Sequence, residues 1–342
     1  SRRVSDPDHS VFVAVRGDRN NGHEFISEAY QKGVRTFIIS EDINLSLVKN
    51  AWVIKVPNTL FCLQLIAHKH LKKFHFPVVG ITGSNGKTIV KEWLYQLLKD
   101  EFHIVKSPKS YNSQVGVPLS VWQCNQEHNF GIFEAGVSKP GEMGALEFMI
   151  QPTIGIFTNL GGAHDENFKN WEEKAKEKLR LFENSKVLIY CRDFLPVHNL
   201  VTKKAHFKEL KTFTWSKKMQ ADLMIGKISK TDVDSTIQGV YQNQFVKINV
   251  PFNDDASIEN CINCWATLLF LGYDSDWVNK RIKFLSPVAM RLELKEGLNN
   301  CSIINDYYNS DFSSLDIALD FMVQQKQHPD KTIILSDILQ SG

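Results

Sequence analysis

The segment from Val78 to Leu94 constrains the fold more than any other part of the sequence. It reads VVGITGSNGKTIVKEWL: an apolar run, a glycine-containing turn, and a helix-period segment that begins with Gly-Lys-Thr. Backbone N–H groups at a helix N-terminus favour phosphate oxygens, and a lysine and a hydroxyl there suit phosphate and Mg²⁺. The usual phosphate-loop spacing needs glycine at position 81, where the chain has Ile81. A plain strand-to-helix turn explains the glycines but not Gly-Lys-Thr, so we favour a nucleotide site with a shorter loop.

The order of apolar runs and helix-period segments predicts an α/β protein. Residues 77–190 alternate between the two, which indicates a mainly parallel sheet that binds ligands beyond the carboxyl ends of its strands. Residues 211–250 are typical of an added β-meander, followed by a helix that starts near Ser257. CSIINDYYNSDFSSLDIALDFMVQQ and KTIILSDI indicate strand, helix and strand, the opening of another parallel α/β unit.

Three domains are expected: a small N-terminal α/β domain over residues 1–76, a central domain over 77–287 and the beginning of a C-terminal domain over 288–342. Pro77 breaks the helix before the first boundary. The last part, about 40 residues long, is too short to be a domain by itself. We therefore expect the chain to be a segment of a longer protein, trimmed at both ends.

Charge and apolar content exclude several classes of protein. The 342 residues include 40 basic and 38 acidic side chains, a formal charge of +2 that gives no field to attract nucleic acid. No apolar run approaches the roughly 18 to 20 residues that a membrane helix needs. The six cysteines form no regular framework, which favours a soluble protein of the reducing cytoplasm.

Cysteines and histidines that could bind metal have simpler interpretations. Cys261 and Cys264 form a C-x-x-C within a helix-period segment, and no second pair completes a zinc site, so we expect buried helix positions. His68, His70 and His75 are expected to be polar positions on a helix and at its exit.

Three residues after apolar strands or on a charged helix are candidates for phosphate and metal chemistry. Glu134 ends FGIFEAG at the binding edge of the sheet, although such a glutamate is as often a cap or an ion-pair partner. His164 follows TNLGGA and is a potential ligand or proton carrier. Lys178 lies in KAKEKLRLF, where the simpler interpretation is a solvated face, and residue chemistry does not separate it from Lys174 or Lys176.

Seven stretches together resemble the ATP-dependent Mur ligases of peptidoglycan synthesis. They are GITGSNGKT, YNSQVGVP, FEAG, TNLGGAH, KEKLRLF, MRLE and INDYYNSD. Their wording is most similar to the MurF branch, and to the form that is fused to an alanine racemase in Bacteroidetes-type bacteria. The short G-x-x-G-K-[ST] loop is characteristic of this family, which accounts for Ile81.

The resemblance implies an ATP- and Mg²⁺-dependent ligase that joins D-alanyl-D-alanine to UDP-MurNAc-tripeptide through an acyl phosphate. It implies an N-terminal domain that holds the UDP-sugar, a central P-loop-type ATPase domain and a Rossmann-like C-terminal domain that closes over ATP. Because the acceptor-selecting residues lie mostly in the C-terminal domain, we expect the chain as given to bind nucleotide but to ligate poorly.

Roles for individual residues also follow from the resemblance. The catalytic residues would be Lys87, His164 and Lys178. ATP would contact Gly83, Ser84, Asn85, Gly86, Lys87, Thr88, Asn260, Arg291 and Asp306. Mg²⁺ would bind Thr88, Glu134, His164 and Lys178, the last as a carbamate. The UDP-precursor would contact Ser1, Arg2, Asn21, Gly22, His23 and Asn112. The family's histidine before Asn260 is Glu259 here, a departure that concerns adenine contacts.

Two alternatives stay open from the sequence. One is another Mur-type or folylpolyglutamate-type ligase. The other is a nucleotide-binding module that no longer ligates and serves a fused racemase as a scaffold.

Overall fold

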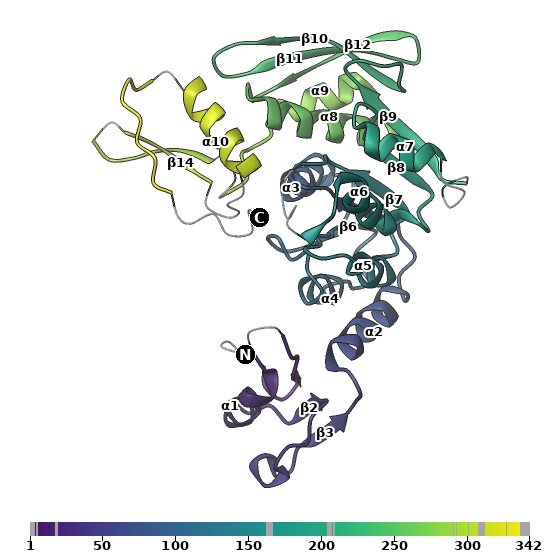
Figure 1. Cartoon of the computed structure of the whole chain (residues 1–342), viewed down its shortest axis with the longest axis vertical. Coiled ribbons are helices and arrows are strands. Elements are labelled where there is room, and N and C mark those ends of the chain that lie inside the picture. Colours follow the sequence, from purple (N-terminus) through teal and green to yellow (C-terminus); the bar gives the residue numbers. More distant parts are fainter. Residues whose placement is uncertain are drawn as a thin grey trace.

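The computed structural model describes residues 4, 6–17, 20–161, 167–203, 207, 209–289, 291, 293–299, 301–306, 312–325 and 327–335. Within these ranges the strands form a three-stranded, a nine-stranded and a two-stranded sheet. Figure 1 shows the small N-terminal sheet at one end of the molecule, the large sheet with its helices in the middle, and the C-terminal hairpin and helix beside it.

The N-terminal sheet is parallel throughout, in the order β1-β2-β3. Its strands are β1 (Val11–Val13), β2 (Thr36–Ile39) and β3 (Trp52–Lys55), and its connections contain η1 (Gly22–Phe25), α1 (Ile26–Gln31) and η2 (Leu45–Val48). Phe37, Ala14 and Ala29 are fully buried in the core between sheet and helix.

Helix α2 (Thr59–Leu71) leads from the small sheet to the large one (Figure 1). The Asn58 side chain accepts a hydrogen bond from the backbone N–H of Phe61 at 2.9 Å, an N-cap that fixes where the helix begins. His68 lies on this helix, as predicted, but its ring is buried and stacked on Phe148 with centroids 4.0 Å apart. Its Nδ1 lies 2.6 Å from the carbonyl oxygen of Phe148, so the buried imidazole keeps a polar partner on a neighbouring helix.

The large sheet has the order β12-β11-β10-β9-β8-β7-β4-β6-β5. The parallel strands are β4 (Val78–Thr82), β5 (Ile104–Lys106), β6 (Phe130–Glu134), β7 (Ile154–Phe157), β8 (Val187–Cys191), β9 (Lys211–Ser216) and β10 (Leu223–Lys230), and β11 (Ser235–Tyr241) and β12 (Gln244–Val250) continue the sheet antiparallel. The helices are α3 (Lys87–Leu98), α4 (Gly116–Val121), α5 (Met143–Ile150), α6 (Trp171–Leu179), η4 (Arg180–Phe182), α7 (Leu195–Lys203), α8 (Asp255–Phe270) and α9 (Ser275–Ile282).

Helices on both faces explain why the central strands are apolar throughout. Every residue of β4, β6, β7 and β8 is buried. Because successive side chains of a strand point to opposite faces, Ile132 joins the core under α3 and α8, whereas Phe133 joins the core under α4 to α7. The predicted α/β class with a mainly parallel central sheet is confirmed.

The β-meander is shorter than the sequence predicted. TFTW was expected to belong to it, but β9 pairs in parallel with β8 over five residues from Lys211 to Trp215. Helix α7 returns the chain to the same edge of the sheet, so β9 and β10 extend the parallel ladder, and antiparallel pairing begins only between β10 and β11.

The C-terminal segment contains β13 (Glu293–Glu296), β14 (Ser302–Asn305) and α10 (Phe312–Gln324). The strand at 302–305 and the following helix are confirmed, but the strand pair is an antiparallel hairpin. The expected strand at KTIIL is wrong for its described residues, since 331–335 have no strand and Ile334 is 97% exposed. A strand needs a neighbour for its backbone N–H and C=O groups, and β14 pairs with β13 instead.

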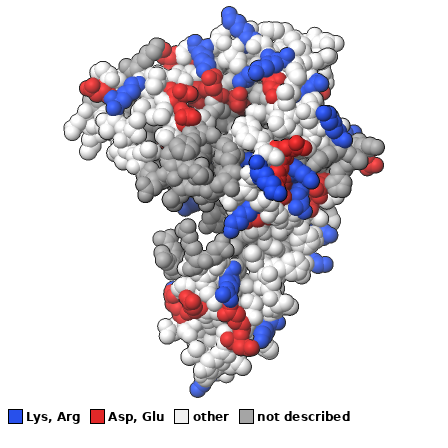
Figure 2. All heavy atoms as spheres, viewed as in Figure 1, with Lys and Arg blue, Asp and Glu red and all other residues white. Residues whose placement is uncertain are grey.

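Figure 2 shows Lys and Arg interspersed with Asp and Glu over the visible face, without a large area of one sign. Across the described ranges, no helix combines the length and the apolar character that crossing a bilayer requires.

Candidate active site

The loop between β4 and α3 has a backbone that only glycine adopts easily. Gly83 has φ +152° and Gly86 has φ +80°. A Cβ at Gly83 would lie 2.0 Å from Thr158 Oγ1, and one at Gly86 would lie 2.2 Å from Asn260 Oδ1. Ile81, by contrast, is a fully buried residue of β4, so position 81 belongs to the strand and needs no glycine. The connection between β4 and α3 is therefore a short loop that starts after Thr82.

Hydrogen bonds hold this phosphate loop (residues 83–88) in shape. Lys87 Nζ donates to the carbonyl oxygens of Gly83 at 2.9 Å and Ser84 at 2.8 Å. The backbone N–H of Asn85 donates to Asn159 Oδ1 at 2.8 Å, which ties the loop to the end of β7. The N-terminus of α3 is thus set at the carboxyl end of the sheet, with Lys87 as its first residue.

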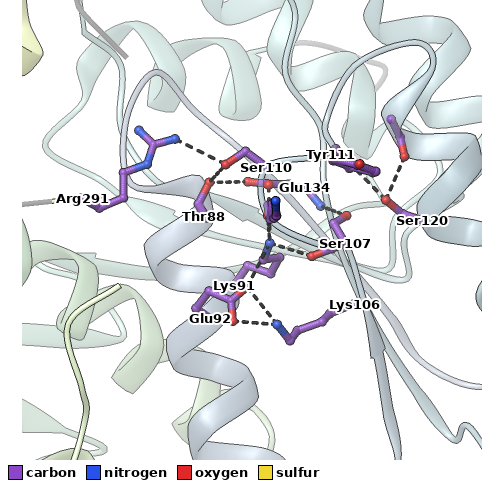
Figure 3. A network of polar contacts seen from close by, with 12 residues as sticks. Thr88, Lys91, Glu92, Lys106, Ser107, Ser110, Tyr111, Ser120, Glu134 and Arg291 are labelled. Atoms are coloured by element: carbon purple, nitrogen blue, oxygen red, sulfur yellow. Dashed lines mark hydrogen bonds and ion pairs between the residues drawn. The ribbon is translucent and has the colours of Figure 1, made fainter. Parts of the chain in front are cut away.

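Thr88 and Glu134 form a buried pair next to the loop (Figure 3). Thr88 Oγ1 donates to Glu134 Oε2 at 2.9 Å, and Glu134 is 0% exposed. Its other oxygen, Oε1, is buried and has no hydrogen-bond partner among the described residues. A carboxylate oxygen with open lone pairs beside a hydroxyl matches the ligands that Mg²⁺ takes, so the donor set fits this cation.

Lys178 lies on α6 but points into the protein. It is 2% exposed, and its Nζ donates to the carbonyl oxygen of Gly83 at 3.1 Å. Lys176 is exposed on the same helix, so the solvated-face interpretation is wrong for Lys178. Burial, followed by the charges of Lys87 and Lys174, holds the pKa of Lys178 well below its usual range, and Glu177 opposes this only partly. This amine is therefore neutral far more readily than an ordinary lysine.

One cavity of about 570 Å³ connects the loop with more distant parts of the chain. Lys87, Thr88, Asn112, Lys178 and Arg291 line it, together with the other loop residues Ser84, Asn85 and Gly86. It is also lined by Val15, Arg16 and Gly17 from the N-terminal region. Most residues of the phosphate loop thus share one cavity with Asn112, which the resemblance predicts to contact the substrate.

Three further candidates, Asn260, Arg291 and Asp306, differ in how they lie relative to this cavity. Asn260 is buried on α8, in van der Waals reach of Gly86, although it does not line the cavity. Arg291 Nη2 is 3.5 Å from Ser110 Oγ, and Ser110 Oγ is 3.1 Å from Thr88 Oγ1. Asp306 follows β14 and is not among the residues that line the cavity.

Asn21 and His23 line another cavity, of about 290 Å³, at the N-terminal sheet. His23 Nε2 accepts from the backbone N–H of Ser40 at 2.9 Å, so its Nδ1 carries the proton toward Asn21 Oδ1 at 2.8 Å. The Asn21 amide donates to Glu41 and is the main cause that lowers the pKa of this carboxyl. Gly22 packs too close to Val15 for any side chain, with 2.7 Å left for a Cβ.

Three predicted site residues, Ser1, Arg2 and His164, lie outside the described residues. Among the described residues, no group of three or more His, Cys, Asp or Glu could hold a metal ion. Cys261 and Cys264 are buried in α8, as expected, and burial raises the pKa of both thiols.

Sequence reasoning missed the side chains that surround Glu134. Lys91, Ser107 and Ser110 form this surrounding network (Figure 3). Lys91 lies four positions after Lys87, on the same side of α3. This spacing is the one feature of the sequence that could have indicated that Lys91 lies near the site. The serines lie in an irregular loop, where no periodicity marks a residue as buried.

Comparisons with known proteins agree with this geometry. Residues 81–268 match the family described as Mur ligase middle domain. The chain is 27% identical over 339 residues to the UDP-N-acetylmuramoyl-tripeptide--D-alanyl-D-alanine ligase of Bacillus subtilis (strain 168), a match that covers 98% of this chain and 72% of that protein.

Two solved structures share the fold. MurF from Acinetobacter baumannii has a TM-score of 0.82 at 20% identity, covering 94% of this chain and 71% of its own. MurF ligase from Thermotoga maritima in complex with ADP has a TM-score of 0.79 at 24% identity, covering 94% of this chain and 73% of its own.

Proposed function

This chain belongs to the Mur ligase family, and from that membership we propose that it joins D-alanyl-D-alanine to UDP-MurNAc-tripeptide with hydrolysis of ATP to ADP and phosphate. The relative from Bacillus subtilis carries the name of this activity and matches nearly the whole chain. The observation that carries the proposal is the buried Thr88–Glu134 pair, with one open carboxylate oxygen, directly behind a phosphate loop. ATP and Mg²⁺ are the cofactors of the reaction.

Phosphorylation is needed because a carboxylate oxygen is too poor a leaving group for an amine to displace. The terminal carboxylate of the tripeptide attacks the γ-phosphorus of ATP, and ADP leaves. The amine of D-alanyl-D-alanine then attacks the carbonyl carbon of the acyl phosphate, phosphate leaves and the amine loses a proton. Mg²⁺, when bound, supplies charge that offsets the phosphate oxygens.

The residues of the chain orient these groups and balance their charge. Loop N–H groups at the start of α3 face the phosphates, and Lys87 exchanges its bonds to the Gly83 and Ser84 carbonyls for phosphate oxygens. Thr88 and Glu134 would hold Mg²⁺ through their oxygens. Arg291 lines the same cavity and adds a further positive charge. Positioning and electrostatic stabilisation supply most of the acceleration.

Coupled ADP release tests this function. The full-length protein is assayed with UDP-MurNAc-tripeptide, ATP and Mg²⁺, with and without D-alanyl-D-alanine, and release should require the dipeptide. Lys87→Ala should lower the rate by about 10²- to 10³-fold, a typical loss for one charge-stabilising donor. Lys99→Ala, at the exposed end of the same helix, is the matched control.

The same assay separates the rival functions. Release with another amino acid acceptor, or with folate and glutamate, would identify a different Mur-type or folylpolyglutamate-type ligase. ATP binding without release under any acceptor would favour the non-ligating module.

Lys178 is the residue that we propose to be carbamylated. Its lowered pKa makes the neutral amine easier to form, and the lone pair of that amine would form an N–C bond to CO₂ while an N–H proton is released to water. The product is an anion that can ligate Mg²⁺, which an ammonium cannot. With ¹³C-bicarbonate, NMR should detect one carbamate carbon that disappears in Lys178→Ala and persists in the control Lys176→Ala. Persistence in Lys178→Ala would contradict the assignment.

His164, Asp306 and Asn260 keep the metal and nucleotide roles proposed from the family resemblance, and Ser1, Arg2, Asn21, Gly22, His23 and Asn112 those at the UDP-precursor. We also propose the domain limits 1–76, 77–287 and 288–342, a cytoplasmic location and a covalently attached alanine racemase. Limited proteolysis tests the limits, cell fractionation tests the location, and the mass and racemase activity of the native protein test the attachment.

A further inference from the structure

A second lysine of α3, Lys91, is completely buried beside the candidate site (Figure 3). It is 0% exposed and is among the largest fully buried side chains of the described chain. An ammonium group loses its hydration in such a place, so its partners must compensate the charge. The roles proposed above for Lys87 and Lys178 do not involve this residue.

The partners of Lys91 come from two sides. Its Nζ donates to the carbonyl oxygen of Ser107 at 2.7 Å and also to that of Lys109. The same nitrogen lies 3.1 Å from Glu92 Oε1 and 3.5 Å from Glu134 Oε1. One buried cation is thus shared between the carboxylate of the candidate metal site and the backbone of the loop after β5.

The distance to Glu134 decides what Lys91 can do there. At 3.5 Å the ammonium attracts Oε1 electrostatically, yet Oε1 has no hydrogen-bond partner among the described residues. Thr88 Oγ1 binds the other oxygen at 2.9 Å. Lys91 and Thr88 thus hold the carboxylate of Glu134 in one rotation, while Oε1 has no hydrogen bond to the described residues.

The backbone contacts act on the neighbouring loop. Lys109 has φ +48°, a left-handed conformation that is costly for a residue with a side chain. The loop that contains it carries Ser110, which contacts Thr88, and Asn112, which lines the cavity. Bonds from Lys91 to the carbonyls on both sides of Pro108 hold this strained segment against α3.

We infer that Lys91 is a positioning residue of the Mg²⁺–nucleotide site, which orients Glu134 and the loop of residues 107–112 from a single buried ammonium. This inference rests on the proposed function, because it concerns the cation that accompanies ATP. Residues that contact and orient metal ligands typically change metal affinity by about 10- to 100-fold when they are substituted.

The test separates the metal-dependent part of nucleotide binding from the rest. ADP affinity is measured by calorimetry in the full chain, once with EDTA and once with saturating Mg²⁺, for the wild type and for Lys91→Met. For Lys91→Met we expect the same ADP affinity in EDTA as for the wild type, because the phosphate loop is untouched. The factor by which Mg²⁺ increases ADP affinity should fall by about 10- to 100-fold.

Lys106→Met is the matched control. Lys106 Nζ contacts Glu92 at 2.7 Å, as Lys91 does at 3.1 Å, but no contact joins it to Glu134 or to the Ser107 carbonyl. This variant should keep the whole Mg²⁺ gain. An equal loss in EDTA and in Mg²⁺ for Lys91→Met, or an equal effect of both variants, would overturn the positioning role.

A second pair of proteins covers the case in which Lys91→Met does not fold, since it leaves a buried carboxylate uncompensated. Glu134→Gln is compared with Glu134→Gln/Lys91→Met. If Lys91 acts through Glu134, the second substitution should change the remaining effect of Mg²⁺ on ADP affinity little. A further loss of the full size would refute the inference that Lys91 orients Glu134. A wild type without any Mg²⁺ gain would instead contradict the proposed function.

Discussion

Lys87 and Lys178 converge on one backbone oxygen, the carbonyl of Gly83, at 2.9 Å and 3.1 Å. Burial is the main cause that lowers the pKa of Lys178, and the positive charges of Lys87 and Lys174 lower it further. The shared carbonyl therefore holds together two amino groups, of which the buried one, Lys178, loses its proton more readily than an ordinary lysine.

A pH dependence of stability follows from the lowered pKa of the buried Lys178. Because the folded state lowers the pKa of Lys178, the unfolded chain keeps a proton that the folded chain has released, up to about pH 10.4. The free energy of unfolding should therefore rise with pH between the pKa of Lys178 in the folded state and about 10.4. Below that range the buried ammonium destabilises the folded state by the full amount.

Denaturant titrations in CO₂-depleted buffer with EDTA check this. Lys178→Met should lack this part of the slope, while Lys176→Met, an exposed neighbour, should retain it. Parallel pH profiles of the wild type and Lys178→Met would contradict the assignment.

Sequence reasoning found the residues whose chemistry has a local pattern. Gly-Lys-Thr after a strand located the loop, and Glu134 was found because it ends an apolar run. Lys178 came only from the family resemblance, because Lys174, Lys176 and Lys178 look alike until the turn of α6 buries two of them. Lys91 was missed because lysines are rarely buried without partners, and its partners come from a distant loop.

At the scale of elements, α8 links the core to the loop. It is buried along most of its length, and it brings Asn260 against Gly86. Its first turn is closed by Asp254, whose side chain accepts from the backbone N–H of Ser257 at 2.7 Å.

Removing this cap should destabilise the protein. Asp254→Ala should lower the free energy of unfolding by about 1 kcal/mol, because an N-terminal donor of α8 loses its acceptor. Asp254→Asn keeps a capping oxygen and should lose much less in the same denaturant titration. Equal losses in the two variants would indicate that the charge of Asp254, and not the cap, is what matters.

Elements were predictable where local pattern and packing agree. The central strands and α8 are long apolar runs with clear ends. The sequence predicts β9 as part of the meander, because nothing within TFTW indicates whether its neighbour runs parallel or antiparallel to it. KTIIL has strand composition, yet its described residues have no strand, since a strand exists only with a partner.

At the scale of the whole molecule, the cavity joins two sheets that are far apart along the chain. Arg16 lies after β1 in the N-terminal region, and it lines the same space as Lys87 and Arg291. A substrate that reaches the loop from the N-terminal sheet would pass this guanidinium, which is largely exposed and pairs with Glu41 at 3.1 Å.

Arg16→Ala should therefore change the KM for UDP-MurNAc-tripeptide but not the KM for ATP. We expect the KM for UDP-MurNAc-tripeptide to rise about tenfold or more, the usual effect of losing a charged hydrogen bond. The KM for ATP should stay constant, since the loop is untouched. Lys49→Ala, an exposed lysine of the same region that does not line the cavity, is the control. A rise in both KM values would place Arg16 at the nucleotide instead.

The bonds from Lys87 to its own loop carbonyls have a thermodynamic consequence. The loop is already folded around Lys87, so a phosphate that binds there replaces the carbonyl acceptors of this lysine without ordering a flexible segment. Little apolar surface is buried in that exchange, and the heat capacity of the system should change little when the phosphates bind. Selectivity for a nucleotide over free phosphate must then come from contacts beyond the loop, because the loop offers the same N–H groups and the same lysine to any phosphate.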